Sequence, residues 1–298
     1  MSDRTVHILI TGSTGQLGRA LLQAPWPEHV RLHAPARDIL DICRPETVDQ
    51  ILREHRFSAI VNAAAFTAVD RAEEEAARAF AVNAYGPAVL ADAARRMDIA
   101  LVHVSTDYVF DGALARPYTE ADVPNPVNVY GASKLAGEMA VRAAAPRSVI
   151  MRTAWLVSAF GVNFATTILR LCDGRESLSV VEDQIGSPTS AVDAAEALSI
   201  VTMRLIEDHE SPRGVFNFVN EGRASRYDLA RALLDARGGG TPTLKAISTQ
   251  DFPLAAQRPA NTRLDNTKIR SAFGLSPRSW AHIAPEIVHS MDQKEDGQ

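Results

Sequence analysis

The sequence has few cysteines and no long hydrophobic run. Its two cysteines, Cys43 and Cys172, stand far apart without CxxC or Cys/His ligand spacing, so we expect neither a disulfide framework nor a zinc site. No stretch approaches the ~20 apolar residues of a membrane span, and residues 1–5 lead directly into a strand-like segment without a signal-peptide hydrophobic region. We therefore expect a soluble, cytoplasmic protein without a membrane partner.

Charge of one sign is not concentrated anywhere in the chain. The 31 basic and 36 acidic residues give a net charge of −5 and are spread along the sequence. Without a basic stripe to neutralise phosphates, nucleic acid is not expected as a partner. A helix N-terminus and a few arginines can still bind an anionic ligand locally. The apolar fraction of 46% and the charged fraction of 22% are typical of a globular chain.

Strand-like and helical patterns alternate over the first half. Strands are predicted at residues 6–11, 30–34, 59–62, 99–105 and 148–152. Helices are predicted from Gly15 onward and at 45–56, 70–97 and 130–145, and Gly86-Pro87 could break the third of these. Residues 110–128 are rich in proline and predict a loop. The alternation predicts an α/β fold of the Rossmann type, a doubly wound parallel sheet whose ligand crevice lies beyond the carboxyl ends of the strands.

The pattern becomes less regular after about residue 155. Helices are predicted near 161–173, 190–207, 225–237 and 278–290, with short strands near 178–181 and 214–219. We expect residues 1–155 to form a Rossmann-type dinucleotide-binding domain. Residues 156–298 would mostly form a smaller C-terminal substrate-binding lobe, partly interleaved with the first domain.

The junction of the first strand and first helix carries three glycines at regular spacing. Residues 12–18 read Gly-x-x-Gly-x-x-Gly, the variant typical of short-chain reductases. Gly12 permits a tight turn, Gly15 lets backbone N–H groups approach a pyrophosphate, and Gly18 lets the helix pack closely on the strand. The motif predicts a dinucleotide site at the start of the chain.

Two charged residues follow the second strand, where the adenosine ribose of a dinucleotide lies. An acidic residue there accepts hydrogen bonds from both ribose hydroxyls, whereas an arginine favours a 2′-phosphate. The chain has both Arg37 and Asp38, so the phosphate preference stays open. We favour NADPH, with NADH as a second possibility.

A tyrosine and a lysine share one face of the helix predicted at 130–145. Tyr130 and Lys134 are four positions apart, which brings phenol and ammonium about one turn from each other. A tyrosine titrating near ~10 is a poor acid at neutral pH, and a nearby cation lowers its pKa. The lysine can also hold the hydroxyls of a nicotinamide ribose. We interpret Tyr130 as a general acid and Lys134 as its helper.

The fourth strand ends in polar residues at the carboxyl edge of the sheet. Thr106 can hydrogen-bond a carbonyl oxygen and orient it toward the Tyr130 phenol, and Asp107 can bind a sugar hydroxyl. A hydroxyl at this strand end, Tyr-x-x-x-Lys on the next helix and a glycine loop after the first strand form a reductase triad. The combination predicts catalysis by Thr106, Tyr130 and Lys134.

These motifs resemble the extended short-chain dehydrogenase/reductase superfamily and, within it, the dTDP-4-dehydrorhamnose reductase family. The resemblance runs in order over nearly the whole chain. The last four of the matching stretches are more specific to that family than the glycine loop. The stretches are Gly12–Gly18, Val61–Glu73, Val104–Gly112, Asn128–Glu138, Arg152–Leu156, Asn163–Leu171, Asp183–Thr189 and Arg258–Leu264.

The resemblance implies further contacts with coenzyme and substrate. Backbone around Gln16 would contact the pyrophosphate, Trp155 the sugar nucleotide, and the two arginines of the last stretch its diphosphate. The predicted coenzyme contacts are Gly12, Thr14, Gly15, Gln16, Leu17, Gly18, Arg37, Asp41, Ala64, Ala65, Phe66, Tyr130 and Lys134. The predicted substrate contacts are Thr106, Asp107, Trp155, Arg258 and Arg263.

The chain departs from the family pattern at several positions. Phe66 stands where a tyrosine or histidine is usual, and Ala154 and Val157 replace a serine and a tyrosine. Some relatives bind magnesium at a dimer contact through acidic residues. Ala20 and Val192 stand at the corresponding positions, so we predict no metal there. These departures leave the sugar preference open, as well as the choice between a monomer and a homodimer.

The implied activity is NAD(P)H-dependent reduction of the C4 keto group of dTDP-4-dehydro-L-rhamnose to dTDP-L-rhamnose, with a nucleotide sugar as the partner. Alternatives are a related nucleotide-sugar 4-ketoreductase, an epimerase, a dehydratase, or a non-catalytic regulatory subunit of the same fold. A dehydratase would need an acidic pair beside Thr106, where only Asp107 stands. The intact triad argues against a subunit without turnover.

Overall fold

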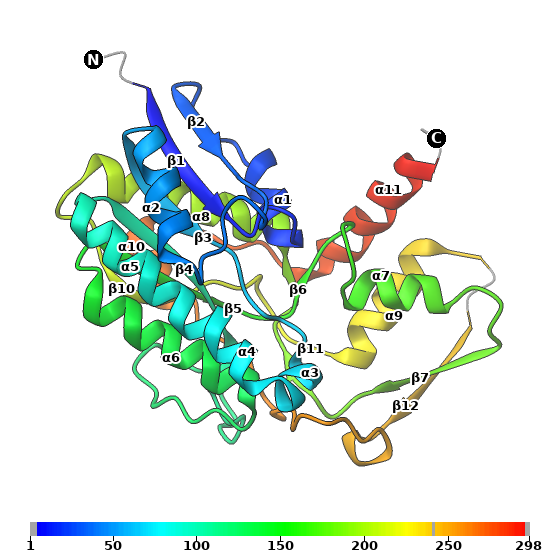
Figure 1. Cartoon of the computed structure of the whole chain (residues 1–298). Coiled ribbons are helices and arrows are strands. Elements are labelled where there is room, and N and C mark those ends of the chain that lie inside the picture. The colour runs from blue at the N-terminus through cyan, green and yellow to red at the C-terminus, as the bar shows by residue number, and fades with distance from the viewer. Residues whose placement is uncertain (1–4, 240–241, 296–298) are drawn as a thin grey trace.

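The computed structural model describes residues 5–239 and 242–295, and within these a central sheet of six strands organises the molecule (Figure 1). Every neighbouring pair of strands in it is parallel. In spatial order the strands are β2 (Val30–His33), β1 (Val6–Thr11), β3 (Phe57–Asn62), β4 (Ala100–Thr106), β5 (Ser148–Thr153) and β10 (Gly214–Asn217).

The strand order reverses between β1 and β3. From β1 the chain first steps outward to β2, then crosses back to β3 and continues to β4 and β5. Loops diverge at such a point, and a crevice forms there at the carboxyl ends of the strands. The predicted doubly wound, Rossmann-type fold is thereby confirmed.

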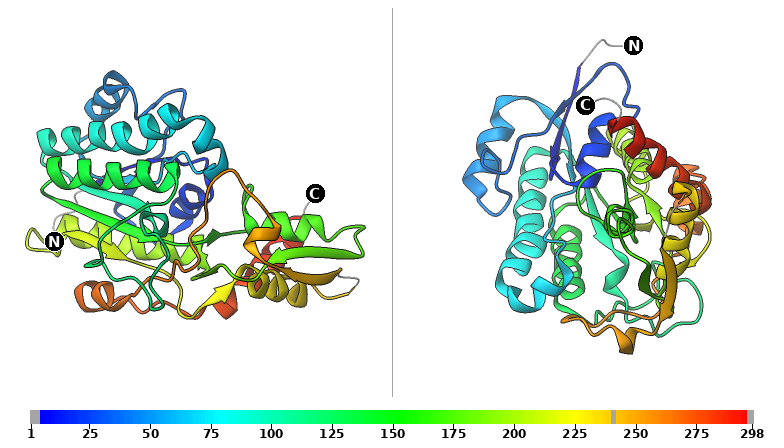
Figure 2. Two further views of the ribbon diagram at one scale, coloured as in Figure 1. Left: turned by 90° about the horizontal axis from the view of Figure 1, so that it is seen from below. Right: turned by 90° about the vertical axis from the view of Figure 1, so that its right-hand side faces the viewer.

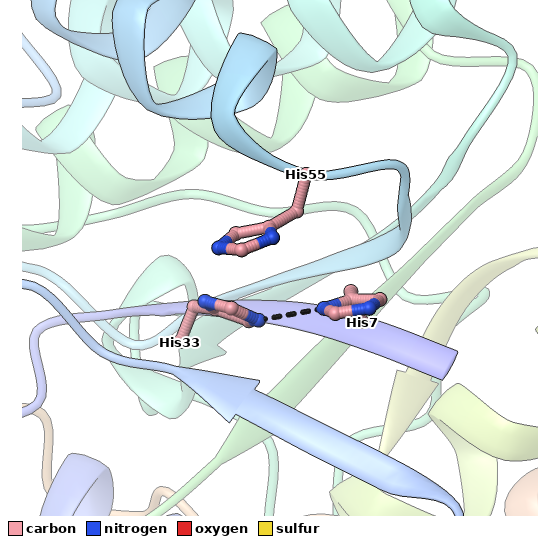
Figure 3. A group of neighbouring side chains, drawn as sticks. All are labelled: His7, His33 and His55. Atoms are coloured by element: carbon pink, nitrogen blue, oxygen red, sulfur yellow. Dashed lines mark hydrogen bonds between the residues drawn. The ribbon is translucent and has the colours of Figure 1, made fainter. Parts of the chain in front are cut away.

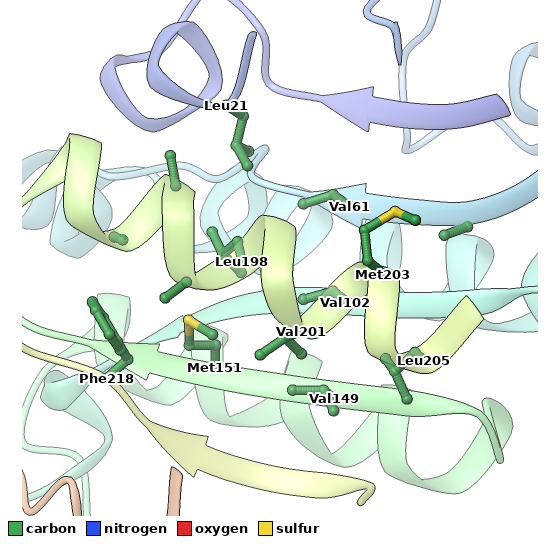
Figure 4. Close-up of a cluster of buried hydrophobic side chains, with 14 of the residues drawn as sticks. Leu21, Val61, Val102, Val149, Met151, Leu198, Val201, Met203, Leu205 and Phe218 are labelled. Atoms are coloured by element: carbon green, nitrogen blue, oxygen red, sulfur yellow. The ribbon is translucent and has the colours of Figure 1, made fainter. Parts of the chain in front are cut away.

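Helices cover both faces of the sheet because successive residues of a buried parallel strand point to opposite sides. Ile8 and Ile10 pack with α1 (Gln16–Gln23), α8 (Ala191–Glu207) and α10 (Thr267–Phe273). Figure 4 shows the buried face of α8, with Leu198 and Val201, lying along β3, β4 and β5. Leu9 points to the other face, where it packs with α2 (Pro45–Glu54), α5 (Gly86–Met97) and α6 (Val129–Ala144).

A separate hydrophobic cluster lies beside the sheet, at the right of Figure 1. It contains α7 (Phe164–Leu171), α9 (Arg226–Arg237) and α11 (Ile283–Glu295). The strands β7 (Ser177–Val181) and β12 (Thr243–Ile247) pair along its outer side (Figure 2). Two short pairs complete it: β6 (Leu156–Val157) with β9 (Thr189–Ser190), and β8 (Ile185–Gly186) with β11 (Ala224–Ser225). In the second half of the chain, β10 is a strand of the central sheet, and α8 and α10 pack on that sheet. This half therefore contributes to both the sheet and the separate cluster.

The helical region before β4 differs from its prediction. It consists of α3 (Val69–Glu74), α4 (Ala76–Phe80), a π-helical turn (Ala81–Tyr85) and α5. The interruption lies at Glu75, whose φ of −111° and ψ of 42° leave the helical region. Gly86 and Pro87 instead begin α5 without a break, because a proline is tolerated in the first turn of a helix. A break at Gly86-Pro87 was therefore the wrong expectation.

The remaining elements follow the predicted pattern, with several additions. Sequence periodicity did not indicate the strands β6, β8, β9, β11 and β12 or the helix α10, all of which are short. The last predicted helix is displaced toward the C-terminus as α11 and is preceded by a short 3-10 turn (Trp280–His282); similar turns occur at Asp107–Val109 and Thr249–Asp251. Among the described residues, no helix combines the length and apolar character required to cross a membrane.

Candidate active site

A cavity of about 640 Å³ opens at the carboxyl edge of the central sheet. Its walls come from the glycine loop, the segments after β2 and β3, the end of β4, the start of α6 and the segment after β5. The lining contains every predicted coenzyme contact except Phe66, and also Thr106, Asp107 and Trp155. The fold therefore gathers most of the predicted residues into one space at the switch point of the strands.

The glycine loop fits its neighbours only without side chains. Gly12 has a φ of +72°, and a Cβ atom there would lie 2.5 Å from the backbone nitrogen of Ala64. A Cβ atom on Gly18 would lie 2.1 Å from the carbonyl oxygen of Gly12. Gly15 begins α1 without a side chain to cap it, so the first N–H groups of the helix face the cavity and can bind an anion.

The loop after β2 brings a cation to the other end of the cavity. Ser13 donates a hydrogen bond to the carbonyl oxygen of Ala34 at 3.2 Å and ties this loop to the glycine loop. Arg37 and Asp41 both line the cavity and form an ion pair at 4.0 Å. The Arg37 side chain is 64% exposed, so its guanidinium can turn toward an anionic ligand at little cost. Asp38 is not among the lining residues.

Tyr130 lies in the first turn of α6, which begins where the Asn128 side chain accepts a hydrogen bond from the Gly131 amide. Its ring contacts the ring of Tyr108 edge to face, with 5.7 Å between centroids. Burial raises the pKa of Tyr130 well above its usual value, and the hydrogen bond with Thr106 opposes this rise. The phenol therefore carries its proton at neutral pH. The expectation that Lys134 lowers this pKa was wrong, because burial dominates and Lys134 is not among its causes.

Lys134 is one of the most buried charged groups, with 2% of its surface exposed. Its Nζ donates a hydrogen bond to the carbonyl oxygen of Val104 at 2.6 Å, which positions the ammonium beside the end of β4. Burial lowers the pKa of Lys134 to about 8, and the charge of Glu138 opposes this effect. The pKa of the buried His103 lies well below its usual value. Desolvation is the larger cause, and the charge of Lys134 contributes to it.

Thr106 and Asp107 end β4 beside the phenol. The Thr106 hydroxyl donates to Asp107 Oδ1 at 3.0 Å and accepts from the Tyr108 amide at 3.2 Å. Burial raises the pKa of Asp107 to about 6, while Thr262, Thr106 and Arg226 hold it back. Its Oδ2 is buried, and no group among the described residues donates to it at hydrogen-bond distance. A buried acceptor without a donor is costly, so Asp107 is suited to bind a ligand hydroxyl.

Trp155 forms part of the cavity wall. It has a φ of +46°, an unfavourable backbone conformation for a bulky residue that often marks a functional site. Its indole nitrogen donates to the Thr262 hydroxyl at 3.1 Å. The guanidinium of Arg226 lies 3.5 Å above the ring, at cation–π distance. Trp155 is therefore held from two sides by residues far away in the sequence.

Arg226 is a candidate functional residue that sequence reasoning missed. It opens α9 after the Ser225 cap, and it interacts electrostatically with Tyr108 and Asp107 beside the cavity. Its local sequence contains no motif that indicates a functional role. It also lies more than seventy positions after β5. A pairing with the Trp155 segment across this distance is visible only in the folded chain.

The two arginines predicted to bind a diphosphate have different surroundings, and neither is among the lining residues. Arg258 forms an ion pair with Asp70 at 2.7 Å, and 12% of the Arg258 side chain is exposed. Arg258 also interacts electrostatically with Tyr108 and Arg226. Arg263 donates to the carbonyl oxygen of Ala115 and to Asn261 Oδ1 and so clamps the loop before Tyr118. Arg258 thus lies near the candidate site, and a substrate role for Arg263 stays a prediction.

The segment after β3 lines the cavity with small residues. Ala64, Ala65 and Thr67 contribute to the lining, whereas Phe66 does not. The backbone of Phe66 exchanges two hydrogen bonds with Asn83 of the π-helical turn, at 2.8 and 3.0 Å. Backbone positions in this segment are therefore fixed, and the role of Phe66 beside a coenzyme stays a prediction.

Several further lining residues were not predicted. Phe160, Gly161 and Val162 lie in the turn between β6 and α7 and form part of the wall beside Trp155. The only sequence signal for them is that Gly161 precedes the Asn163 helix cap. Such a turn is common on protein surfaces and does not by itself indicate a cavity.

Comparison with known proteins agrees with this geometry. Residues 6–293 match the model of the family described as the RmlD substrate binding domain. A dTDP-4-dehydrorhamnose reductase of Aggregatibacter actinomycetemcomitans is 42% identical over 288 residues, which cover 94% of this chain and 98% of the relative.

Solved structures of similar proteins superpose closely. A dTDP-4-dehydrorhamnose reductase from Clostridium acetobutylicum gives a TM-score of 0.91 at 36% identity and covers 96% of this chain and 100% of its own. A dTDP-4-dehydrorhamnose reductase from Bacillus anthracis, solved in complex with NADP, gives a TM-score of 0.87 at 35% identity, covering 97% and 99%. The similarity therefore extends over both the sheet and the neighbouring cluster.

Proposed function

The chain belongs to the family of the RmlD substrate binding domain, and on this premise we propose that it is a dTDP-4-dehydrorhamnose reductase. It reduces the C4 keto group of dTDP-4-dehydro-L-rhamnose to give dTDP-L-rhamnose, with NADPH as the hydride donor and NADH as a weaker substitute. The observation that carries the proposal is the placement of Tyr130 and Thr106 in one cavity with Lys134 and the glycine loop.

The residues of the cavity fit a dinucleotide. Gly12 and Gly18 let the turn pack tightly against neighbouring backbone, and the open N-terminus of α1 would hold the pyrophosphate. Arg37 would bind the 2′-phosphate of NADPH, which supports our preference for that coenzyme. The small residues Ala64 and Ala65 would lie along the dinucleotide. The bound coenzyme supplies the hydride for C4 of the sugar.

Proton transfer belongs to the protein. As negative charge develops on the former ketone oxygen, Tyr130 donates its Oη proton to that oxygen, and hydride and proton together convert the ketone to a secondary alcohol. Thr106 orients the carbonyl by a hydrogen bond. The Lys134 ammonium, held by the Val104 carbonyl oxygen, would bind the hydroxyls of the nicotinamide ribose.

The wall formed by Trp155 supports sugar-nucleotide binding. The buried Oδ2 atom of Asp107 accepts no hydrogen bond from the described residues, so it would accept one from a sugar hydroxyl. Arg226 and Arg258 bring two positive charges toward Tyr108, which suits a diphosphate. We also propose that residues 156–298 mostly form the substrate-binding lobe beside the dinucleotide-binding residues 1–155. Assembly as a monomer or homodimer stays a prediction.

The test is NADPH oxidation with dTDP-4-dehydrorhamnose generated in situ. We expect absorbance of NADPH to fall only when the keto sugar is present, and the product to be identified as dTDP-L-rhamnose. NADPH binding without oxidation in the presence of this substrate would contradict the proposal. Oxidation that yields a different sugar epimer would identify a related 4-ketoreductase instead.

A further inference from the structure

Three histidines from separate elements lie together beside β1 of the central sheet (Figure 3). They are His7 on β1, His33 at the end of β2, and His55, which follows the last residue of α2. They are separated by 26 and 22 positions in the sequence. This spacing explains why no ligand motif was visible in the sequence and why we expected no zinc site.

The register of the strands explains the meeting. His33 pairs with Leu9 and lies on the same face of the sheet as His7, because His7 and Leu9 are two residues apart on one strand. On the other side, His7 pairs with Phe57 of β3. His55 precedes Phe57 by two residues and is thereby brought above His7.

The donor atoms of the three rings lie close together. His7 Nδ1 and His33 Nε2 are 2.8 Å apart, and the three residues each offer a nitrogen within 4.8 Å of the others. The ring centroid of His55 lies 4.2 Å from that of His33 and 4.9 Å from that of His7. Within the described part of the chain, the His7–His33 bond is the only side-chain hydrogen bond that any of the three rings makes.

We propose that His7, His33 and His55 form a binding site for a divalent transition metal of the zinc, nickel or copper class. Neutral imidazole is the common protein ligand for these ions. A zinc–nitrogen bond of about 2.0–2.1 Å in tetrahedral geometry requires donor nitrogens about 3.3 Å apart. The His7–His33 distance of 2.8 Å is below that value and all three nitrogens lie within 4.8 Å of one another, so modest rotations of the rings bring them to it.

The surroundings suit an ion at this point. His55 is exposed and His7 and His33 are half-buried, so an ion can enter from solvent and keep water as its fourth ligand. The Glu54 carboxylate is close enough to interact electrostatically with His33 and favours a cation. Hard cations such as magnesium prefer oxygen ligands, so they do not fit a set of three nitrogens.

The site is distinct from the candidate active site, since none of the three histidines lines that cavity. A bound ion would join β1 to β2, the outermost strand on that side of the sheet, and to the end of α2. The ion would thereby fix the position of β2, the strand that leads into the loop containing Arg37. The proposal does not depend on the proposed enzymatic activity.

The test is zinc binding by the full chain without a histidine tag, after chelator treatment. We expect titration calorimetry to give one zinc per chain. His55→Gln should weaken binding by at least about 100-fold, since even loss of an indirect ligand partner costs 10–100-fold. His209→Gln, at an exposed position outside the cluster, is the matched control and should bind as the unmodified chain does.

Thermal unfolding supplies a second readout. Zinc at about 100 times its Kd should raise Tm by about 5 °C in the unmodified chain and in the control, and not in His55→Gln. His55 is exposed, so this variant should fold, and His7→Gln provides an independent check. Binding that is as tight in both variants as in the unmodified chain, or no binding at all, overturns the proposal.

Discussion

The two halves of the large cavity are built in different ways. The glycine-loop half consists of lining residues from three segments at the ends of neighbouring strands. They are residues 11–18, then Pro35, Arg37, Leu40 and Asp41, and then residues 63–65 and Thr67. The tryptophan half consists of Asp107 and Trp155, which line the cavity, and of Arg226 and Thr262, which contact them from outside the lining. Tyr130 and Lys134 stand between the halves.

This difference teaches which changes each half tolerates. In the glycine-loop half, Gly12 and Gly18 leave no room for a Cβ atom, so substitutions at these two positions should disturb packing and coenzyme binding together. The tryptophan half depends on side-chain charges and hydrogen bonds, so substitutions there should change use of the sugar while coenzyme binding persists. The predictions below test this separation, from the largest expected effect to the smallest.

The largest effect is expected at the residue between the halves. Tyr130→Phe removes the only proton donor that we assign, so kcat should fall by about 1000-fold. The NADPH dissociation constant should change little, because the ring and its contact with Tyr108 remain. Steady-state kinetics measures kcat, and titration of coenzyme fluorescence measures the dissociation constant. Near-normal turnover would show that another group supplies the proton.

Within the glycine-loop half, Gly18→Ala should be the most damaging substitution. Its Cβ atom would lie 2.1 Å from backbone, which cannot move without shifting the turn. We expect the free energy of unfolding to fall by about 3 kcal/mol, the upper range for overpacking. Gly15→Ala is the control for stability, since its Cβ atom would be 3.4 Å from its nearest neighbour. Equal destabilisation of the two variants would refute the packing argument.

In the tryptophan half, Arg226→Gln should act on the sugar alone. Loss of a charged hydrogen-bonding group costs about 2.7 kcal/mol at most, so kcat/KM for the keto sugar should fall by up to about 100-fold. The KM for NADPH should not change. Arg223→Gln, at an exposed position nearby, should leave both constants intact. A rise in the KM for NADPH with Arg226→Gln would break the separation between the halves.

Lys134 predicts a pH dependence of stability. Its folded pKa of about 8 lies below the ordinary value of 10.5, so between these values the unfolded chain binds more protons and stability rises with pH. The buried charge therefore costs stability below pH 8 and this cost declines above it. Relative to Lys134→Met, the unmodified chain should gain about 2 kcal/mol between pH 7 and 9.5. Denaturant unfolding at several pH values measures the difference; a constant difference would contradict burial of an ionised lysine.

The smallest effect concerns coenzyme choice in the glycine-loop half. Arg37→Ala should reduce the preference for NADPH over NADH by about fivefold, because an exposed charge pair contributes roughly 1 kcal/mol. Steady-state kinetics with both coenzymes measures the ratio. Arg44→Ala, which removes an exposed arginine outside the cavity, is the control. An unchanged ratio would mean that Arg37 does not bind the 2′-phosphate.

The sequence predicted those parts of the site whose residues are close together in the chain. Gly12, Gly15 and Gly18 lie within seven residues at a strand–helix junction, and Tyr130 and Lys134 lie on one helix face. Local spacing fixes such geometry once the strand and helix form. It did not reveal the burial around Tyr130, which raises the pKa of the phenol where a lysine was expected to lower it.

The alternation of strands and helices by itself determined the parallel sheet, the crevice at its carboxyl edge and the glycine loop there, since each follows from short-range backbone rules. Only the tertiary structure decided that Arg226 lies over Trp155 and that His7, His33 and His55 share one place. Contacts between residues many positions apart depend on how whole elements pack, and hydrophobic periodicity specifies which face is buried without specifying its partner.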